Sequence, residues 1–209
     1  LRPDLAESHT ALGSYFYYGL LDYPRALAEF AAALRIQPNN GEALKAIGAV
    51  LRRQGRWVEA AEKFSTAADL DPKNAGPLFE FGFTSQLAGR YADADRAYAR
   101  TLTLNPHWAE VYGERAWVQL LWHGDVGKAQ VVLDEAGSVV GLVDEAGFLA
   151  QYRLQVALAR RDYRGALRQL QADTRGAIDN QDEYSPISLL RGQVQRLAAT
   201  YDLARRSFE

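Results

Sequence analysis

Apolar and polar positions alternate along this chain with the spacing of helices, and the pattern repeats every 34 residues. Between residues 41 and 72, apolar or small residues recur three or four positions apart in two runs of about fourteen residues, which is the spacing of two amphipathic helices. The same slots recur over residues 75–106 and, with one extra residue near 18–21, before Pro38. A fixed period of this length predicts one small helical hairpin copied in series.

Proline and glycine mark the ends of the predicted helices. Pro38, Pro72 and Pro106 follow the second helix of successive units, and proline cannot continue a helix. Gly55 and Gly89 stand where the first helix must end and the chain must reverse. That position suits a residue that tolerates positive φ.

Two further glycines, Gly48 and Gly82, lie inside predicted first helices. Glycine there costs about 1 kcal/mol relative to alanine, so a packing gain must compensate. We expect the second helix to approach closely at these points. Ala60 and Ala94 are the small residues expected to face the two glycines.

An aromatic residue opens two of the predicted second helices. Trp57 and Tyr91 each occupy the slot after the turn, where the side chain can pack back on the first helix. Aromatic residues at helical spacing dominate the energetics of cores. We therefore predict that both are structural core residues rather than contacts for a partner.

The pattern resembles the tetratricopeptide repeat family, whose 34-residue signature places W, L-G, Y, A, F and P in these slots. The resemblance is strongest over residues 7–106, continues through a unit at 109–140 and weakens near 147–180. It implies an all-α, right-handed superhelical solenoid of antiparallel helix hairpins with about eleven or twelve helices and no sheet.

The resemblance also implies a domain organisation. We expect a single solenoid over residues 1–209, and both of its ends are typical of a segment excised from a larger protein. The expected units cover approximately residues 6–40, 41–74, 75–108, 109–143 and 147–183, with a partial unit at 185–209.

Composition and charge exclude several classes of partner. The net charge is −2, from 24 basic and 26 acidic residues, which is not the electrostatic footprint of a nucleic-acid-binding protein. No apolar run approaches the roughly 20 residues that span a bilayer. The chain has no cysteine, which fits a reducing compartment. We therefore expect a cytoplasmic protein with no nucleic-acid or membrane partner, while a targeting segment upstream would permit export.

The sequence contains no constellation typical of catalysis. Each of His9, His107 and His123 lacks a second histidine three or four residues away, so spacing predicts no metal site. The pair Gly127-Lys128 lacks the earlier glycine and the following hydroxyl of a phosphate-binding loop. We predict neither enzymatic activity nor a cofactor.

The resemblance implies that a partner binds on the inner, concave wall formed by the first helix of each unit. The wall-facing slots in the middle of the chain hold aromatic and apolar residues, and the neighbouring unit contributes basic residues beside them. This surface suits an amphipathic helix or an extended segment of a protein, with hydrophobic anchors and acidic neighbours. The predicted partner-binding residues are Tyr17, Tyr18, Lys45, Arg52, Arg53, Phe79, Phe83, Gln86, Trp117 and Leu120.

One subtype of the family is not expected. Its chaperone-binding members hold a peptide's terminal carboxylate with lysine, asparagine and arginine side chains. The corresponding slots here hold Thr10, Ser14, Ala46, Gly76 and Glu80. The carboxylate clamp is therefore missing, and a chaperone tail is not the predicted partner.

Two roles remain open at this point. The stretches 3–26 and 52–57 resemble repeat arrays attached to bacterial signalling proteins, namely cyclases, protein kinases and winged-helix activators. That resemblance implies a regulatory or scaffolding arm. The alternative is a structural spacer or a self-association element that forms a homo-oligomer, in which Phe79, Phe83 and Trp117 are packing residues. A small-ligand sensor would need a closed pocket that the sequence does not predict.

Overall fold

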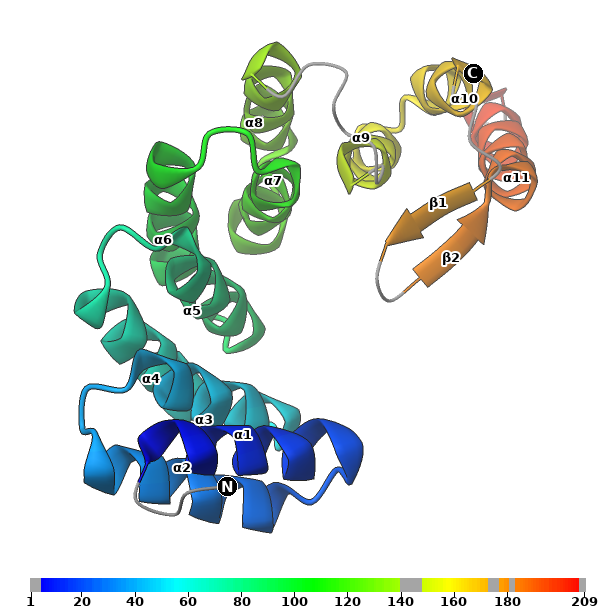
Figure 1. Cartoon of the computed structure of the whole chain (residues 1–209). Helices are drawn as coiled ribbons and strands as arrows, with labels where there is room; N and C mark the ends of the chain where they lie inside the picture. The colour runs from blue at the N-terminus through cyan, green and yellow to red at the C-terminus, as the bar shows by residue number, and fades with distance from the viewer. Residues whose placement is uncertain (1–4, 140–147, 173–176, 181–182, 207–209) are drawn as a thin grey trace. The chain divides into compact units, whose positions relative to one another are not determined.

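The computed structural model describes residues 5–139, 148–172, 177–180 and 183–206 (Figure 1). Within these ranges it contains eleven α-helices, one π-helical turn and one β-hairpin. The predicted architecture of repeated helix hairpins is confirmed, because consecutive helices pack as pairs. The chain forms two compact units, Leu1–Asn105 and Pro106–Glu209. The right-handed superhelical path and the six-unit division stay predictions.

The first compact unit contains three helix pairs. In each pair a first helix packs on a second helix, and α2 and α4 also pack on the first helix that follows them. The elements are α1 (Ala6–Ser14), the π-helical turn η1 (Tyr15–Gly19), α2 (Tyr23–Ile36), α3 (Gly41–Arg53), α4 (Trp57–Leu70), α5 (Ala75–Leu87) and α6 (Tyr91–Leu104).

The turns inside the pairs have the predicted backbone. Gly55 has a φ of 74° and Gly89 a φ of 72°. After each glycine, the chain closes onto the helix it has left: the Arg56 amide donates to the Leu51 carbonyl at 3.0 Å, and the Arg90 amide donates to the Ser85 carbonyl at 2.8 Å. This closure satisfies carbonyl groups that the end of a helix leaves without partners.

The extra residue of the first unit is absorbed by η1. A π-helix adds one residue to a helical turn. The helix pair of the first unit can therefore keep the same arrangement as the next two pairs despite the extra residue. The Asp22 amide donates to the Phe16 carbonyl at 2.8 Å, one residue further back than in the next two turns. Leu21, with a φ of 52°, takes the positive-φ position.

Close approach of the second helix at the mid-helix glycines is confirmed, but the facing residues differ from the prediction. A Cβ on Gly48 would lie 2.9 Å from Cζ of Phe64, and one on Gly82 would lie 2.8 Å from Cε1 of Tyr98. The aromatic rings, rather than Ala60 and Ala94, therefore occupy the space that glycine leaves.

The prediction that Trp57 is a core residue is wrong. Trp57 is 42% exposed, and Tyr91 is half-buried. Both residues are the first of their helix, so their side chains lie at the end of the pair. The interior of this unit is filled instead by Phe30, Phe64 and Tyr98, which are almost fully buried.

The second compact unit contains two helix pairs, a β-hairpin and a long final helix. A core of Leu154, Ala166, Leu170, Ile187 and Val194 joins α9, α10 and α11. The elements are α7 (Ala109–His123), α8 (Val126–Val139), α9 (Phe148–Ala159), α10 (Tyr163–Ala172), β1 (Ala177–Asn180), β2 (Glu183–Pro186) and α11 (Ile187–Arg206).

The β-hairpin differs from the prediction that the chain has no sheet. Its strands are antiparallel, with Ala177 opposite Pro186 and Asn180 opposite Glu183. It lies where the fifth predicted unit was expected to end. Asp179 and Asn180 disfavour helix interiors, and Pro186 lacks the amide that a continuous helix needs. The resemblance to the helical repeat is also weakest in this part of the sequence.

Candidate partner-binding surface

The first helices of unit Leu1–Asn105 border a concave hollow, and this hollow is the candidate binding site. Its volume is about 590 Å3, within the range of ligand-binding pockets. The side chains come from α1, the loop before α3, α3 itself, the end of α4 and the start of α5. They are Glu7, Thr10, Ala11, Ser14, Gln37, Asn39, Asn40, Gly41, Glu42, Lys45, Ala67, Leu70, Asp71, Asn74 and Pro77.

Asparagine side chains fix the start of two helices beside the hollow. Oδ1 of Asn40 accepts from the Ala43 amide at 2.9 Å, and Oδ1 of Asn74 accepts from the Gly76 amide at 3.0 Å. Asparagine is among the preferred residues at this position because it satisfies an amide that the helix leaves open. The two caps stabilise the first turns of α3 and α5, which lie beside the hollow.

The charge in the hollow is mainly negative. Glu7, Glu42 and Asp71 contribute carboxylates, and Lys45 is the single lysine or arginine of the lining. Nζ of Lys45 lies 2.6 Å from Oε1 of Glu42. The lysine predicted to meet acidic groups of a partner is therefore already paired within its own helix.

Arg52 is also paired, and this pairing was not predicted. Its Nη1 donates to Oε2 of Glu80 at 2.5 Å, between α3 and α5. The guanidinium also lies over the rings of Phe64 and Phe83, 5.4 and 5.3 Å from their centroids. In the sequence pattern, Glu80 occupies one of the slots of the missing carboxylate clamp. Its place on the first helix of the next repeat after Arg52 was the available sequence signal.

The predicted aromatic residues of α5 lie partly within the unit. Phe79 and Phe83 are half-buried and stack with ring centroids 6.3 Å apart. Phe79 also contacts the ring of Tyr98 at 6.0 Å between centroids. Arg52 covers Phe83 from the side of α3. These rings therefore contribute to packing between repeats as well as to the inner surface.

Two predicted partner-binding residues are buried, which corrects their assignment. Tyr17 is 7% exposed and packs with Phe30 and Val50, because η1 rotates it toward the core. Gln86 is 9% exposed and accepts a hydrogen bond from the Tyr98 hydroxyl at 3.2 Å. Neither side chain can be a main contact for a partner.

The remaining residues of the first unit's prediction reach solvent. Tyr18 is 76% exposed and lies against Tyr17, with 4.4 Å between ring centroids. Arg53 is exposed at the end of α3. Tyr18 and Arg53 do not line the hollow, so the structure brings only Lys45 of the predicted set into it.

Trp117 and Leu120 belong to the second compact unit, where both are half-buried on α7. The neighbouring slot at Gly113 is covered by Tyr152 of α9, since an added Cβ would lie 2.1 Å from Cδ2 of that ring. The Tyr152 hydroxyl donates to Oε1 of Glu114 at 2.7 Å. Burial, followed by the Glu114 charge, raises the pKa of Tyr152 well above its ordinary value.

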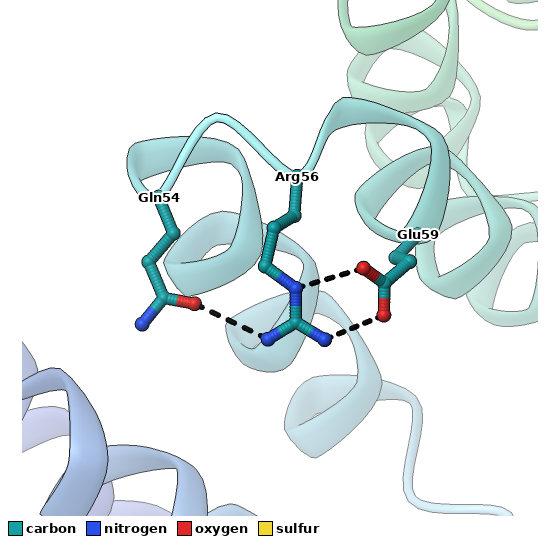
Figure 2. A network of polar contacts seen from close by, with 3 residues as sticks. All are labelled: Gln54, Arg56 and Glu59. Carbon is teal, nitrogen blue, oxygen red and sulfur yellow. Dashed lines mark hydrogen bonds and ion pairs between the residues drawn. The ribbon is translucent and has the colours of Figure 1, made fainter.

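A conspicuous charged cluster at the α3–α4 turn is structural (Figure 2). Arg56 donates to both carboxylate oxygens of Glu59, at 2.8 and 2.5 Å, and to Oε1 of Gln54 at 3.4 Å. These hydrogen bonds raise the pKa of Arg56 and lower that of Glu59. Arg90 and Asp93 form the same pair at the start of α6, so this pairing recurs as a feature of the repeat.

The described part of the chain contains neither a cluster of side chains that could bind a metal ion nor a helix that could span a membrane. In these ranges, no three histidine, aspartate or glutamate side chains come together in a way that could hold a metal ion. The described helices also include none long and apolar enough to cross a bilayer.

Residues 41–74, which include α3, α4 and the turn between them, match the sequence profile of the tetratricopeptide repeat. The same slots recur in the units on either side. Residues 41–74 therefore correspond to one tetratricopeptide repeat. A comparison with curated proteins finds no match.

Solved structures of tetratricopeptide repeat proteins are similar to this chain in fold. A repeat protein of Parabacteroides merdae ATCC 43184 is 19% identical with a TM-score of 0.73, over 96% of this chain and 76% of that one. YrrB, described as having an unusual peptide-binding site, is 15% identical with a TM-score of 0.64, over 96% and 93%.

A third structure, the first repeat domain of Spaghetti (RPAP3) bound to the HSP90 peptide SRMEEVD, is 16% identical with a TM-score of 0.52. It covers 57% of this chain and 96% of that one. At such identities these likenesses concern the fold.

Proposed function

We propose that this tetratricopeptide repeat protein is an interaction module that binds a segment of a partner protein on the inner surface of unit Leu1–Asn105. The hollow carries the proposal, because it is concave, borders the first helices and has a volume of about 590 Å3. Stacked repeats of this kind use such surfaces for binding. Family members generally act as non-catalytic scaffolds, so binding rather than catalysis is the proposed activity.

Relatives in fold give this proposal its context. YrrB is described by its peptide-binding site, and the Spaghetti domain is bound to a peptide that ends in glutamate, valine and aspartate. Thr10 and Ser14 line the hollow here, in slots where chaperone-binding members carry charged or amide side chains. The proposed partner therefore differs in chemistry from an acidic chaperone tail.

A regulatory or scaffolding arm of a larger signalling protein is the role we propose for this module. A second role, as a spacer or self-association element, is favoured by one observation. The side chain of Arg52 on α3 contacts both Glu80 and Phe83 on α5. Part of the predicted aromatic surface therefore already takes part in packing between repeats.

Photo-crosslinking tests the proposed function. Peptides that bind the full chain are first selected from a random twelve-residue display library. A benzoylphenylalanine then replaces Ser14, which lines the hollow, and in a matched variant it replaces Thr66, which is exposed on α4. We expect crosslinks to the peptide only from position 14. Crosslinks only from position 66, or no selectable peptide, contradict the proposal, and chain-to-chain crosslinks support self-association.

A further inference from the structure

We propose that the hollow of unit Leu1–Asn105 selects a basic segment, and that it receives a lysine or arginine side chain of the partner. The inference rests on the proposed function and adds the charge of the partner. It reverses the expectation of acidic neighbours, because that expectation relied on Lys45 and Arg52. Both are paired with glutamates of this chain, at 2.6 and 2.5 Å.

Carboxylates reach the hollow from three separate elements. Glu7 lies on α1, Glu42 on α3, and Asp71 directly follows α4. Lys45 neutralises Glu42 at 2.6 Å. Within the described residues, Glu7 and Asp71 have no ion pair or side-chain hydrogen bond. Two negative charges therefore remain for a partner.

The helix starts beside the hollow oppose this charge without cancelling it. α3 and α5 begin at its edge, and each helix N-terminus carries roughly half a positive charge. The first turn of α3 already contains Glu42, and both starts are capped by asparagine oxygens. Two full carboxylate charges exceed these partial charges, so the hollow is expected to attract cations.

The lining suits an organic cation on an aliphatic stem. Ala67, Leu70 and Pro77 contribute apolar carbon to the same hollow as Asp71. Lysine and arginine lay their methylene groups along apolar surface while their charge stays near water and acceptors. Asn39 adds an amide that can bond a peptide backbone.

A metal ion is not the occupant that this arrangement favours. Among the described residues, the carboxylates do not come together as a group of three that could share one ion. Charges spread over the ends of three helices suit an extended segment that presents its cationic groups along its length. A protein segment is therefore preferred over a free divalent cation.

The test compares two double variants of the full chain with the same selected peptides. Glu7→Gln with Asp71→Asn removes the two uncompensated carboxylates of the hollow. Glu62→Gln with Asp69→Asn removes two exposed carboxylates of α4 that lie outside the lining. The net charge changes equally, so long-range attraction is matched. Fluorescence anisotropy measures peptide affinity, and circular dichroism confirms that both variants are folded.

We expect peptides selected on the unmodified chain to be enriched in lysine and arginine. The hollow variant should bind them about three- to tenfold more weakly, the range that two partly exposed ion pairs supply. The control variant should change affinity less than about twofold. As an independent reversal of charge, Asp71→Lys should shift selection toward acidic peptides.

Each other outcome overturns the inference. Enrichment of acidic or neutral peptides that still crosslink at position 14 refutes the basic partner but leaves the proposed function intact. An equal loss in both double variants shows long-range attraction instead of a site. Failure to select any peptide, or crosslinks only from position 66, contradicts the proposed function itself.

Discussion

Replacing Gly82 by alanine should destabilise the protein, although alanine is the better helix former. An added Cβ would lie 2.8 Å from Cε1 of Tyr98 and 3.2 Å from Cβ of Ala97. Tyr98 is fully buried, and its hydroxyl donates to Gln86 at 3.2 Å. The ring therefore cannot move aside without losing packing and this hydrogen bond.

The expected magnitude follows from two opposing effects. Alanine in place of glycine within a helix gains about 1 kcal/mol. Forcing a methyl group into a well-packed core costs about 1–3 kcal/mol. The free energy of unfolding should therefore fall by up to about 2 kcal/mol. Gly192 in α11 is the matched control, because no atom lies within 4 Å of its added Cβ, and Gly192→Ala should raise stability by up to about 1 kcal/mol.

Urea unfolding followed by far-ultraviolet circular dichroism measures both variants. A double-mutant cycle separates the contact from helix propensity: in a Tyr98→Leu background, Gly82→Ala should lose its penalty. If Gly82→Ala stabilises the protein as much as Gly192→Ala, the close approach of α6 to α5 is refuted.

Three further predictions test other parts of the structure. Trp57→Ala should cost about 1 kcal/mol, against about 3–5 kcal/mol for buried Phe64→Ala, and equal losses in calorimetry would show that Trp57 is core. A hydrogen bond from the Arg25 amide lowers the pKa of Asp22. The stability that this cap contributes should therefore be present at neutral pH and lost as the pH falls through the lowered pKa. An NMR titration midpoint of Asp22 at or above the usual aspartate value would contradict this. Tyr152→Phe should cost about 1–2 kcal/mol, because buried Glu114 loses a donor, and an unchanged urea midpoint would refute that contact.

The repeat period made the helices and turns predictable. Each slot has the same local environment in every unit, so Gly55 and Gly89 could be assigned to turns before their φ values were known. Gly48 and Gly82 likewise indicated close approach. The sequence pattern predicted alanines opposite these glycines, whereas aromatic rings face them in the structure.

The partner-binding surface was less predictable, because it depends on contacts between repeats. The pairing of Arg52 with Glu80 joins two helices whose relative rotation is not readable from the period. The insertion in η1 changes the rotation of the residues after Ser14, which carries Tyr17 into the core. At these positions, the location of a residue in its repeat does not predict whether its side chain faces the inner surface.

The most direct test of the central claim is an NMR titration of the isotope-labelled full chain with a selected lysine-rich peptide. The predicted result is that amide shifts change over the lining of the hollow, from Glu7 to Ser14 on α1 and at Glu42, Lys45 and Asn74, while amides on the outer turns of α2 and α6 stay unchanged. Shift changes confined to the second helices would contradict binding on the inner surface.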